Sequence, residues 1–350
     1  MRISVVIPTY KRPESLLRAL RSVREQSWPQ HEVIVVDNAA DPEVARLVGE
    51  VAAAAPVPVR YVSEPELGLH NARHAGARAA RGEILVFTDD DATFDSGWLA
   101  AYARRFSEHP EMAAASGAIR LAWEKLPPQW LVDYIGDAKD FGLLGLRESY
   151  PDFRLEPDGV LYGGNMAIRR DVLFAVGGFN PENFGDVWLG DGETGLNRKL
   201  WQRDLLVGYV PAALVYHHIP PARMTVRYLC RRMANEGACG EYAAFHDGIP
   251  GPPGLALRLG RISLALGKLA LLTAWRAVVA RDRFALLRAR LGLAFHMYRV
   301  RYVLRLSHDR AFRALVTKTD WLAVPDVGTA AESLAGRAPG AGHLPAGRAQ

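Results

Sequence analysis

Short apolar runs rich in valine and isoleucine alternate with amphipathic stretches through residues 1–90 of this chain. The apolar runs predict strands at residues 2–8, 32–36, 59–62 and 84–87. The stretches between them have apolar residues at helical spacing, at residues 13–26, 42–55 and 69–80. Strands that alternate with helices form a parallel sheet with helices on both faces, so this order predicts an α/β fold.

Polar residues stand where the predicted strands end. Thr9 follows the first strand, Asp37 ends the second, and Asp89, Asp90 and Asp91 follow the fourth. In open parallel sheets, ligands bind at the carboxyl ends of the strands. The sequence therefore predicts a binding site at this edge of the sheet.

The three carboxylates of Asp89, Asp90 and Asp91 repel one another, which is costly at a strand end unless a cation neutralises them. A divalent metal with oxygen ligands, shared with a phosphate-bearing substrate, is the simplest partner. A solvated acidic turn is the competing interpretation. The apolar strand directly before the run favours the metal.

Charge is distributed unevenly along the 350 residues, whose net charge is +5. Residues 1–254 carry 27 Lys and Arg against 33 Asp and Glu, whereas residues 255–313 carry 13 against 2. This distribution argues against a nucleic-acid-binding protein, whose positive charge would lie on the folded domain. It favours a catalytic domain followed by a basic segment that meets anionic lipid.

Other classes lack their sequence signals. No G-x-G-x-x-G follows the first strand and no G-x-x-x-x-G-K-[ST] occurs, so neither a dinucleotide fold nor a P-loop is indicated. Cys230 and Cys239 make neither a disulfide framework nor a four-ligand zinc site. The first apolar run is too short for a signal peptide, so we expect a cytoplasmic location.

Four motifs in the N-terminal half resemble those of the family 2 glycosyltransferases, inverting enzymes of the GT-A fold that use nucleotide-diphospho-sugars. The motifs are VVIPTY (5–10), VVDN (35–38), GLHNAR (68–73) and DDD (89–91), and the likeness covers roughly residues 1–220. The resemblance implies a set of donor-binding residues, which are Pro8, Thr9, Tyr10, Asp37, Arg73, Asp89 and Asp90. It also implies that Asp89 and Asp91 are the family's D-x-D pair, with Asp91 as the firmest ligand of Mg²⁺ or Mn²⁺.

Two later segments resemble the acceptor side of the same family. The first contains Gly163, Gly164 and Asn165, which implies that these residues contact the acceptor, although a simple turn is the alternative. The second is GDGETGLNRKLW (190–201), and an inverting transfer needs one carboxylate there as a base. Helical spacing favours Glu193 as this base, with Asp191 second; otherwise both acids only stabilise a helix N-terminus.

Three histidines qualify the resemblance. His217 fits a V-x-H pattern that lies beside the metal or pyrophosphate in many relatives, so it is a candidate third metal ligand. A structural histidine at a strand end is the alternative. The family commonly has asparagine where this chain has His74, and His70 occupies a variable position.

The C-terminal part has a different character. Residues 255–306 predict long helices, and in residues 255–279 the cations Arg258, Arg261, Lys268 and Arg276 fall within roughly 80° of the helix circumference. The remaining Leu/Ala/Trp face is typical of a helix in a membrane interface, and packing on the catalytic domain is the alternative. Residues 327–350, rich in Ala, Gly and Pro, predict a disordered tail.

We therefore expect an α/β protein with a GT-A type, mostly parallel sheet flanked by helices and a helical C-terminal extension. Residues 1–220 would form the glycosyltransferase domain, with a nucleotide-sugar half (1–110) and an acceptor half (111–220). Residues 221–313 would form the basic, apolar extension.

The expected activity is metal-assisted, single-displacement transfer of a sugar from a nucleotide-diphospho-sugar to a hydroxyl of a glycan or lipid-linked acceptor. The enzyme would serve cell-surface polysaccharide synthesis, peripherally bound to the inner face of the cell membrane. Three alternatives remain: a polyprenyl-phosphate glycosyltransferase, a sugar-nucleotide-binding protein without transfer activity, and a sugar-1-phosphate nucleotidyltransferase. The last normally has a Gly-rich phosphate loop, of which PTYKRP (8–13) is a poor version.

Overall fold

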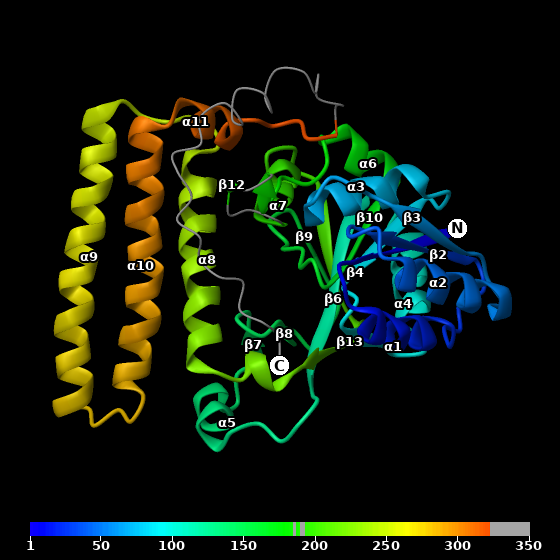
Figure 1. The fold of residues 1–350 in the computed structure, drawn as a ribbon, viewed down its shortest axis with the longest axis horizontal. Helices are drawn as coiled ribbons and strands as arrows, with labels where there is room; N and C mark the ends of the chain where they lie inside the picture. Colours follow the sequence, from blue (N-terminus) through cyan, green and yellow to red (C-terminus); the bar gives the residue numbers. More distant parts are fainter. Residues whose placement is uncertain (185–186, 190–192, 323–350) are drawn as a thin grey trace.

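The structure, a computed structural model, describes residues 1–184, 187–189 and 193–322. A twisted sheet with helices on both faces forms one part, and the long helices α8, α9 and α10 stand side by side at its edge (Figure 1). None of the helices in the described ranges is long and apolar enough to cross a bilayer. Asp191 and the predicted tail at 327–350 lie outside the described residues.

The elements within the described residues alternate through the N-terminal half and become helical after β13. The strands are β1 (Ile3–Thr9), β2 (His31–Asp37), β3 (Val59–Ser63), β4 (Ile84–Thr88), β5 (Ala92–Phe94), β6 (Met112–Trp123), β7 (Asp140–Phe141), β8 (Leu146–Arg147), β9 (Arg154–Glu156), β10 (Asn165–Arg169), β11 (Asn183–Phe184), β12 (Val187–Trp188) and β13 (Leu206–Ile219). The helices are α1 (Pro13–Val23), α2 (Pro42–Ala54), α3 (Leu69–Ala79), α4 (Trp98–Glu108), α5 (Gln129–Ile135), α6 (Arg170–Ala175), α7 (Glu193–Trp201), η1 (Pro221–Arg223), α8 (Val226–Phe245), α9 (Pro252–Val278), α10 (Ala285–His308) and α11 (Arg310–Val316).

The sheet has a parallel half and a mixed half, and its main path runs β3-β2-β1-β4-β10-β6-β13-β5. Strands β1 to β4 are parallel, whereas β10 lies antiparallel between β4 and β6. The register pairs Thr9 with Asp37, so the ends of β1 and β2 lie side by side. The predicted α/β architecture is confirmed, as are the seven elements predicted within residues 1–90.

Successive side chains of each central strand point to opposite faces of the sheet. Val5 packs into a core that α1, α2 and α4 cover, and Val6 packs into a second core with α3, α6 and α7. Both faces are therefore buried, which explains why the strands read as continuous apolar runs.

The long strand β6 is absent from the sequence-based prediction. Its first eight residues are buried, although the run MAAASGAI (112–119) has small side chains and weak strand propensity. At Gly117 a Cβ atom would overlap Ala213 O and Asn165 Nδ2, so the close packing of β6, β10 and β13 requires a glycine there. The small residues of β6 have low strand propensity, but they allow this close approach.

The C-terminal helices share a core with the sheet domain. Tyr302 on α10 donates a hydrogen bond to Leu189 O at 2.9 Å, and α8 also contacts α7. Arg258, one of the four cations predicted to share one side of α9, bonds the buried carboxylate of Glu241 on α8. The helix α9 thus has an inner face packed on its neighbours as well as an outer face.

Candidate active site

A cavity of about 950 Å³ opens at the carboxyl ends of β1 and β4 and extends to α7 and α8. Its volume is at the upper end of the range for small-molecule sites. The charged and imidazole side chains that line it come from most of the chain and are Arg12, Arg73, Asp89, Asp90, Asp91, Glu182, Glu193, His217, Arg223, Arg232 and Glu236. Pro8, Thr9, Tyr10, Gly163 and Gly164 line it as well. The structure thus gathers most of the sequence-predicted site residues around one space.

Asp90 is fixed at the end of β4 by two neighbours. Thr9 donates its hydroxyl proton to Asp90 Oδ2 at 2.7 Å, and Arg12 Nη1 lies 3.2 Å from Asp90 Oδ1. Burial raises the pKa of Asp90 to about 6, although Thr9 and Arg12 oppose the shift. Asp90 therefore connects the end of β4 to the end of β1 through its contacts with Thr9 and Arg12.

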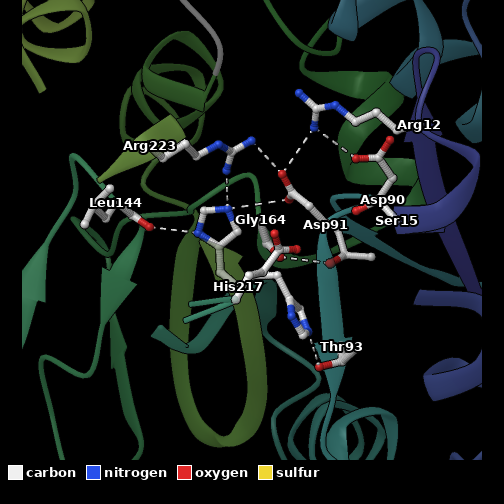
Figure 2. Close-up of polar contacts among 12 residues, drawn as sticks. Arg12, Ser15, Asp90, Asp91, Thr93, Leu144, Gly164, His217 and Arg223 are labelled. Atoms are coloured by element: carbon white, nitrogen blue, oxygen red, sulfur yellow. Dashed lines mark hydrogen bonds and ion pairs between the residues drawn. The ribbon is translucent and has the colours of Figure 1, made fainter. Parts of the chain in front are cut away.

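Asp91 is surrounded by cationic side chains (Figure 2). Arg223 Nη2 lies 2.6 Å and Arg12 Nη1 3.2 Å from Asp91 Oδ2. Burial alone would raise the pKa of Asp91, but the contact with His217 and the positive charges of Arg223 and Arg12 outweigh it and hold the pKa below its usual range. The carboxyl group is therefore an anion held among cations.

His217 on β13 points its ring toward Asp91 (Figure 2). Its Nδ1 lies 2.7 Å from Leu144 O, which can only accept, so Nδ1 carries the proton. Its Nε2 then accepts from Arg223 Nη1 at 2.7 Å and lies 3.5 Å from Asp91 Oδ1. The backbone carbonyl thus fixes the tautomer that leaves Nε2 available as a metal ligand.

The residues around Asp91 fit a divalent metal that also takes ligands from its substrate. Within the described ranges, no three His, Cys, Asp or Glu side chains converge into a complete metal site. Asp91 Oδ1, however, is buried without a hydrogen-bond partner, beside His217 Nε2. Mg²⁺ and similar ions in nucleotide enzymes commonly use one or two carboxylates plus phosphate oxygens, which matches this set.

Asp89 is the third acid of the run and is half-buried at the cavity wall. Burial and the neighbouring charge of Asp91 both raise its pKa. A cation at this position would relieve both effects, because it stabilises the ionised form. Asp89 is therefore placed to join Asp91 at a metal.

Glu193 lies at the first turn of α7 and lines the same cavity as the acids that follow β4. Its Oε1 accepts from Arg73 Nη1 at 2.7 Å, and the buried Arg73 guanidinium lies 5.2 Å from the centre of the Phe179 ring. Gly163 makes this pair possible, since a Cβ there would overlap Glu193 Oε1 and Arg73 Nη2. Helix α3, the glycine turn and α7 together orient one carboxylate into the cavity.

Two more acids that were not predicted from the sequence, Glu182 and Glu236, line the cavity. Burial raises the pKa of Glu182 and that of Glu236, and the charge of Glu193 adds to both shifts. Arg232 on α8 lies 3.8 Å from Glu236. No motif marks these acids; the apolar spacing of α8 would only have indicated a helix near the site. Arg12 and Arg223 were also missed, although both closely follow strand ends.

Two predicted site residues do not face the cavity. Asn165 is fully buried and makes four hydrogen bonds, because its amide donates to Ala118 O and Ala213 O and accepts from Trp98 and Tyr102. The prediction that Asn165 contacts the acceptor is wrong, since its hydrogen-bonding capacity is used within the core.

Asp37, predicted to bind the donor, does not line the cavity either. It is fully buried, and its carboxylate accepts from the backbone N–H groups of Ala39 and Asp41 and from the Tyr61 hydroxyl. The next residue, Asn38, lines the cavity instead and accepts from the N–H of Gly68. Asp37 therefore shapes the loop after β2 rather than the cavity wall.

His74 has a structural role. Its Nε2 accepts from the backbone N–H of Phe179 at 2.9 Å, and burial holds its pKa well below the usual range. The neutral ring joins α3 to the segment after α6. His74 does not line the cavity.

Comparison with known proteins agrees with this architecture. A mannosyltransferase from Pyrobaculum calidifontis, solved in complex with GDP-Man and Mn²⁺, superposes with a TM-score of 0.59 over 86% of each chain at 22% identity. This likeness concerns the fold, which is of the GT-A type. Residues 4–176 match the model of glycosyl transferase family 2. These residues form a glycosyl transferase family 2 domain.

Two curated relatives are identical to this chain at about a quarter of the aligned positions. The glucosyl-dolichyl phosphate glucuronosyltransferase of Haloferax volcanii is 26% identical over 182 residues, which is 51% of this chain and 56% of the relative. The succinoglycan biosynthesis protein ExoM of Rhizobium meliloti is 25% identical over 240 residues, which is 68% of this chain and 73% of that protein. The chain thus matches little more than half the length of the first relative.

Proposed function

We propose that this protein transfers a sugar, with inversion, from a nucleotide-diphospho-sugar to a hydroxyl group of a glycan or lipid-linked acceptor, with the help of Mg²⁺ or Mn²⁺. The observation that carries the proposal is the arrangement of two kinds of carboxylate around one cavity. Asp89 and Asp91 stand at the β4 end, and Glu193 stands at the α7 end. A donor diphosphate at the first end and an acceptor at the second would meet between them.

The donor occupies the β1 and β4 end in this proposal. Pro8, Thr9 and Tyr10 line that end and Asn38 closes it, so they form the nucleotide pocket. Asp89, Asp91 and His217 hold the metal, which when bound neutralises the charge that develops on the departing diphosphate. The P. calidifontis mannosyltransferase, which shares the fold, was solved with GDP-Man and Mn²⁺, a donor and metal of the kinds proposed here.

Glu193 is the base of a single displacement. It takes the proton of the acceptor hydroxyl, whose oxygen forms a bond to the anomeric carbon while the bond to the diphosphate oxygen breaks. Attack from the face opposite the leaving group inverts the configuration. Arg73 holds the carboxylate in position through Oε1, and Asp191, outside the described residues, is the second candidate for the base.

The acceptor wall favours a hydroxyl-rich group over a phosphate. Glu182, Glu193 and Glu236 line this end of the cavity, and the cations beside them are Arg73 and Arg232. An excess of carboxylates repels a phosphate monoester and pairs well with sugar hydroxyls. We therefore prefer a glycan, free or lipid-linked, over a polyprenyl phosphate. The names of the two relatives, which concern a dolichyl-linked sugar and succinoglycan, are consistent with this choice.

The outer face of α9 supports a peripheral position at a membrane. Seven exposed residues follow one another at steps of three and four along this face, which form the α9 stripe: Leu257, Arg261, Leu264, Lys268, Leu271, Trp275 and Val278. Two cations, Arg261 and Lys268, stand among five apolar side chains in the stripe, as in helices that lie in the interface of an anionic bilayer. An enzyme docked in this way would meet lipid-linked acceptors at the inner face of the cell membrane.

A thermal-shift screen of UDP-, GDP- and dTDP-sugars tests the donor site. A ligand at 100 times its Kd stabilises the folded state by about 2.7 kcal/mol, which raises the Tm by several degrees. We expect a rise with one nucleotide family in Mn²⁺, none in EDTA, and none for Asp91→Ala. Equal shifts in EDTA would contradict the metal, and no shift with any donor would favour a different specialisation of the fold.

A further inference from the structure

Two arginines pair with the carboxylate of Asp91. Arg12 follows β1 and Arg223 ends η1, so they reach the same carboxylate oxygen, Asp91 Oδ2, from opposite sides of the cavity (Figure 2). Both arginines line the cavity that we assign to the donor. A buried carboxylate needs such partners, because an uncompensated charge is costly in the interior.

Arg223 covers two expected metal ligands at once. One nitrogen of its guanidinium contacts Asp91 Oδ2 and the other contacts His217 Nε2, the atom whose lone pair a metal would use. A metal bound by Asp91 Oδ1 and His217 Nε2 cannot coexist with the Arg223 contact, since Nε2 has a single lone pair and Arg223 already occupies it. The arginine therefore stands in for the cation.

Arg12 does not owe its position to burial. Its side chain is 51% exposed, yet its guanidinium turns inward and lies 3.2 Å from both Asp90 and Asp91. An exposed arginine gives up rotamer freedom for such a contact, and the electrostatic attraction of the acidic run holds it there. The side chain is free to move to another anion in the same cavity.

We propose that Arg12 and Arg223 exchange partners when the donor binds: they leave Asp91 and His217 to the metal and bind the diphosphate oxygens. This inference rests on the proposed function. Arginine is suited to the second role, because its planar fork binds phosphate through two parallel hydrogen bonds. The exchange keeps the charges paired before and after binding, so neither state contains an uncompensated carboxylate.

The exchange couples the metal to the nucleotide. Metal alone must displace two cations that then lack partners, so it binds weakly. Nucleoside diphosphate supplies those partners, so each ligand increases the affinity for the other by the same factor. The protein would thereby avoid holding a metal without its substrate.

Titrations of Mn²⁺ alone, followed by electron paramagnetic resonance or calorimetry, test the first half of the exchange. Removal of a competing cation lets Mn²⁺ reach Asp91, so we expect Arg223→Gln and Arg12→Gln to bind Mn²⁺ about tenfold more tightly than the unaltered protein. Arg223→Lys keeps the charge and stays close to the unaltered protein. Arg227→Gln and Arg21→Gln remove exposed arginines on α8 and α1 and serve as matched controls.

Calorimetry with UDP and GDP in saturating Mn²⁺ tests the second half. The two glutamine variants should bind the nucleotide that the unaltered protein prefers about tenfold less tightly, because the diphosphate loses a bidentate partner. The exchange predicts that the same variant binds Mn²⁺ more tightly and the nucleotide less tightly. A merely structural role would weaken the binding of both. Weaker or unchanged Mn²⁺ binding in both variants would overturn the exchange.

If the proposed function were wrong, the same titrations would give a different result. If the unaltered protein bound Mn²⁺ but neither nucleotide, the donor site would be wrong and the partner exchange with it. If it bound a nucleotide normally and the variants did so too, only the exchange would be overturned. Folding is checked by the Tm of each variant, and the half-exposed Arg12 is the safer position.

Discussion

Gly163 leaves room for the ion pair between Arg73 and Glu193, where any side chain would overlap both partners. Gly163→Ala should therefore move Glu193 and lower kcat by about 10²-fold, because displacements near 1 Å have effects of that size. Strain should also lower the free energy of unfolding by about 1–3 kcal/mol. Steady-state kinetics and urea unfolding measure both.

Gly142→Ala is the matched control for this substitution. Gly142 lines the same cavity, but its added methyl group would meet no atom within 4 Å. It should keep near-normal kcat. If both alanine variants were equally active, the Arg73–Glu193 pair would not be the device that positions the base.

His70 makes the stability depend on pH. Burial, helped by Lys318 and Arg73, lowers its pKa to about 4. The unfolded chain therefore binds the proton more tightly, and stability is lost as the pH falls from about 6.5 to about 4. The loss amounts to about 3 kcal/mol, and His70→Leu should remove that part of it.

Urea unfolding at several pH values between those limits measures the effect. His74, whose pKa is also lowered by burial, contributes a loss of the same sign and remains in the variant. An unchanged pH dependence in His70→Leu would show that His70 is solvated in the folded state.

At the residue scale, the motifs located the site better than the direction of each side chain. The family's motifs mark Glu193 and His217, and both residues line the cavity as predicted. Asn165 and Asp37 also stand in motif segments but point elsewhere. The partners of Asn165 on α4 and β13 come from distant sequence, whereas Asp37 binds the backbone of the loop that follows it. Adjacency in a motif does not fix orientation.

Among the elements, local pattern predicted β1 to β4 and missed β6. The strands β1 to β4 have β-branched runs whose period and length are sufficient to identify a strand from the sequence. The alanines of β6 suit its crowded position between β10 and β13, and this requirement is tertiary. The two long helices predicted within residues 255–306 are confirmed as α9 and α10, because their apolar spacing is local.

Glu241 joins α8, α9 and α10. It is fully buried and bonds Arg258 on α9 at 2.9 Å and Arg299 on α10 at 2.6 Å. Glu241→Gln leaves two guanidinium groups undercompensated and should lower the free energy of unfolding by about 3–5 kcal/mol. Urea unfolding measures the loss.

A triple variant separates charge from packing. Glu241→Leu with Arg258→Met and Arg299→Met removes all three charges, so stability should return to about the original value or exceed it. If the triple variant were as unstable as Glu241→Gln, the triad would be needed for the shape of the bundle. The comparison uses the same unfolding curves.

For the whole molecule, the α9 stripe predicts the location of the enzyme. Leu264 and Leu271 are 76% and 75% exposed, and their joint replacement by serine should weaken binding to vesicles of phosphatidylglycerol and phosphatidylcholine by about tenfold or more. Vesicle sedimentation of the full chain measures this. Added salt should also weaken binding, since the stripe includes Arg261 and Lys268.

Leu126→Ser is the control for the vesicle experiment. Leu126 is 94% exposed but lies outside α9, before α5, so its loss should not matter. Equal effects of the two replacements would indicate general surface hydrophobicity rather than a docking face. Absence of binding by the unaltered protein would remove the membrane from the proposal.

The place of β10 in the sheet has a consequence for protein synthesis. Residues 165–169 pair with β4 and β6, so these two strands stay apart until the ribosome has released a strand translated long after β4. The cavity wall contributed by α8 emerges later still, at residues 226–245. A nascent chain therefore cannot assemble a complete donor site early, and nucleotide-sugar can stabilise only a nearly finished polypeptide.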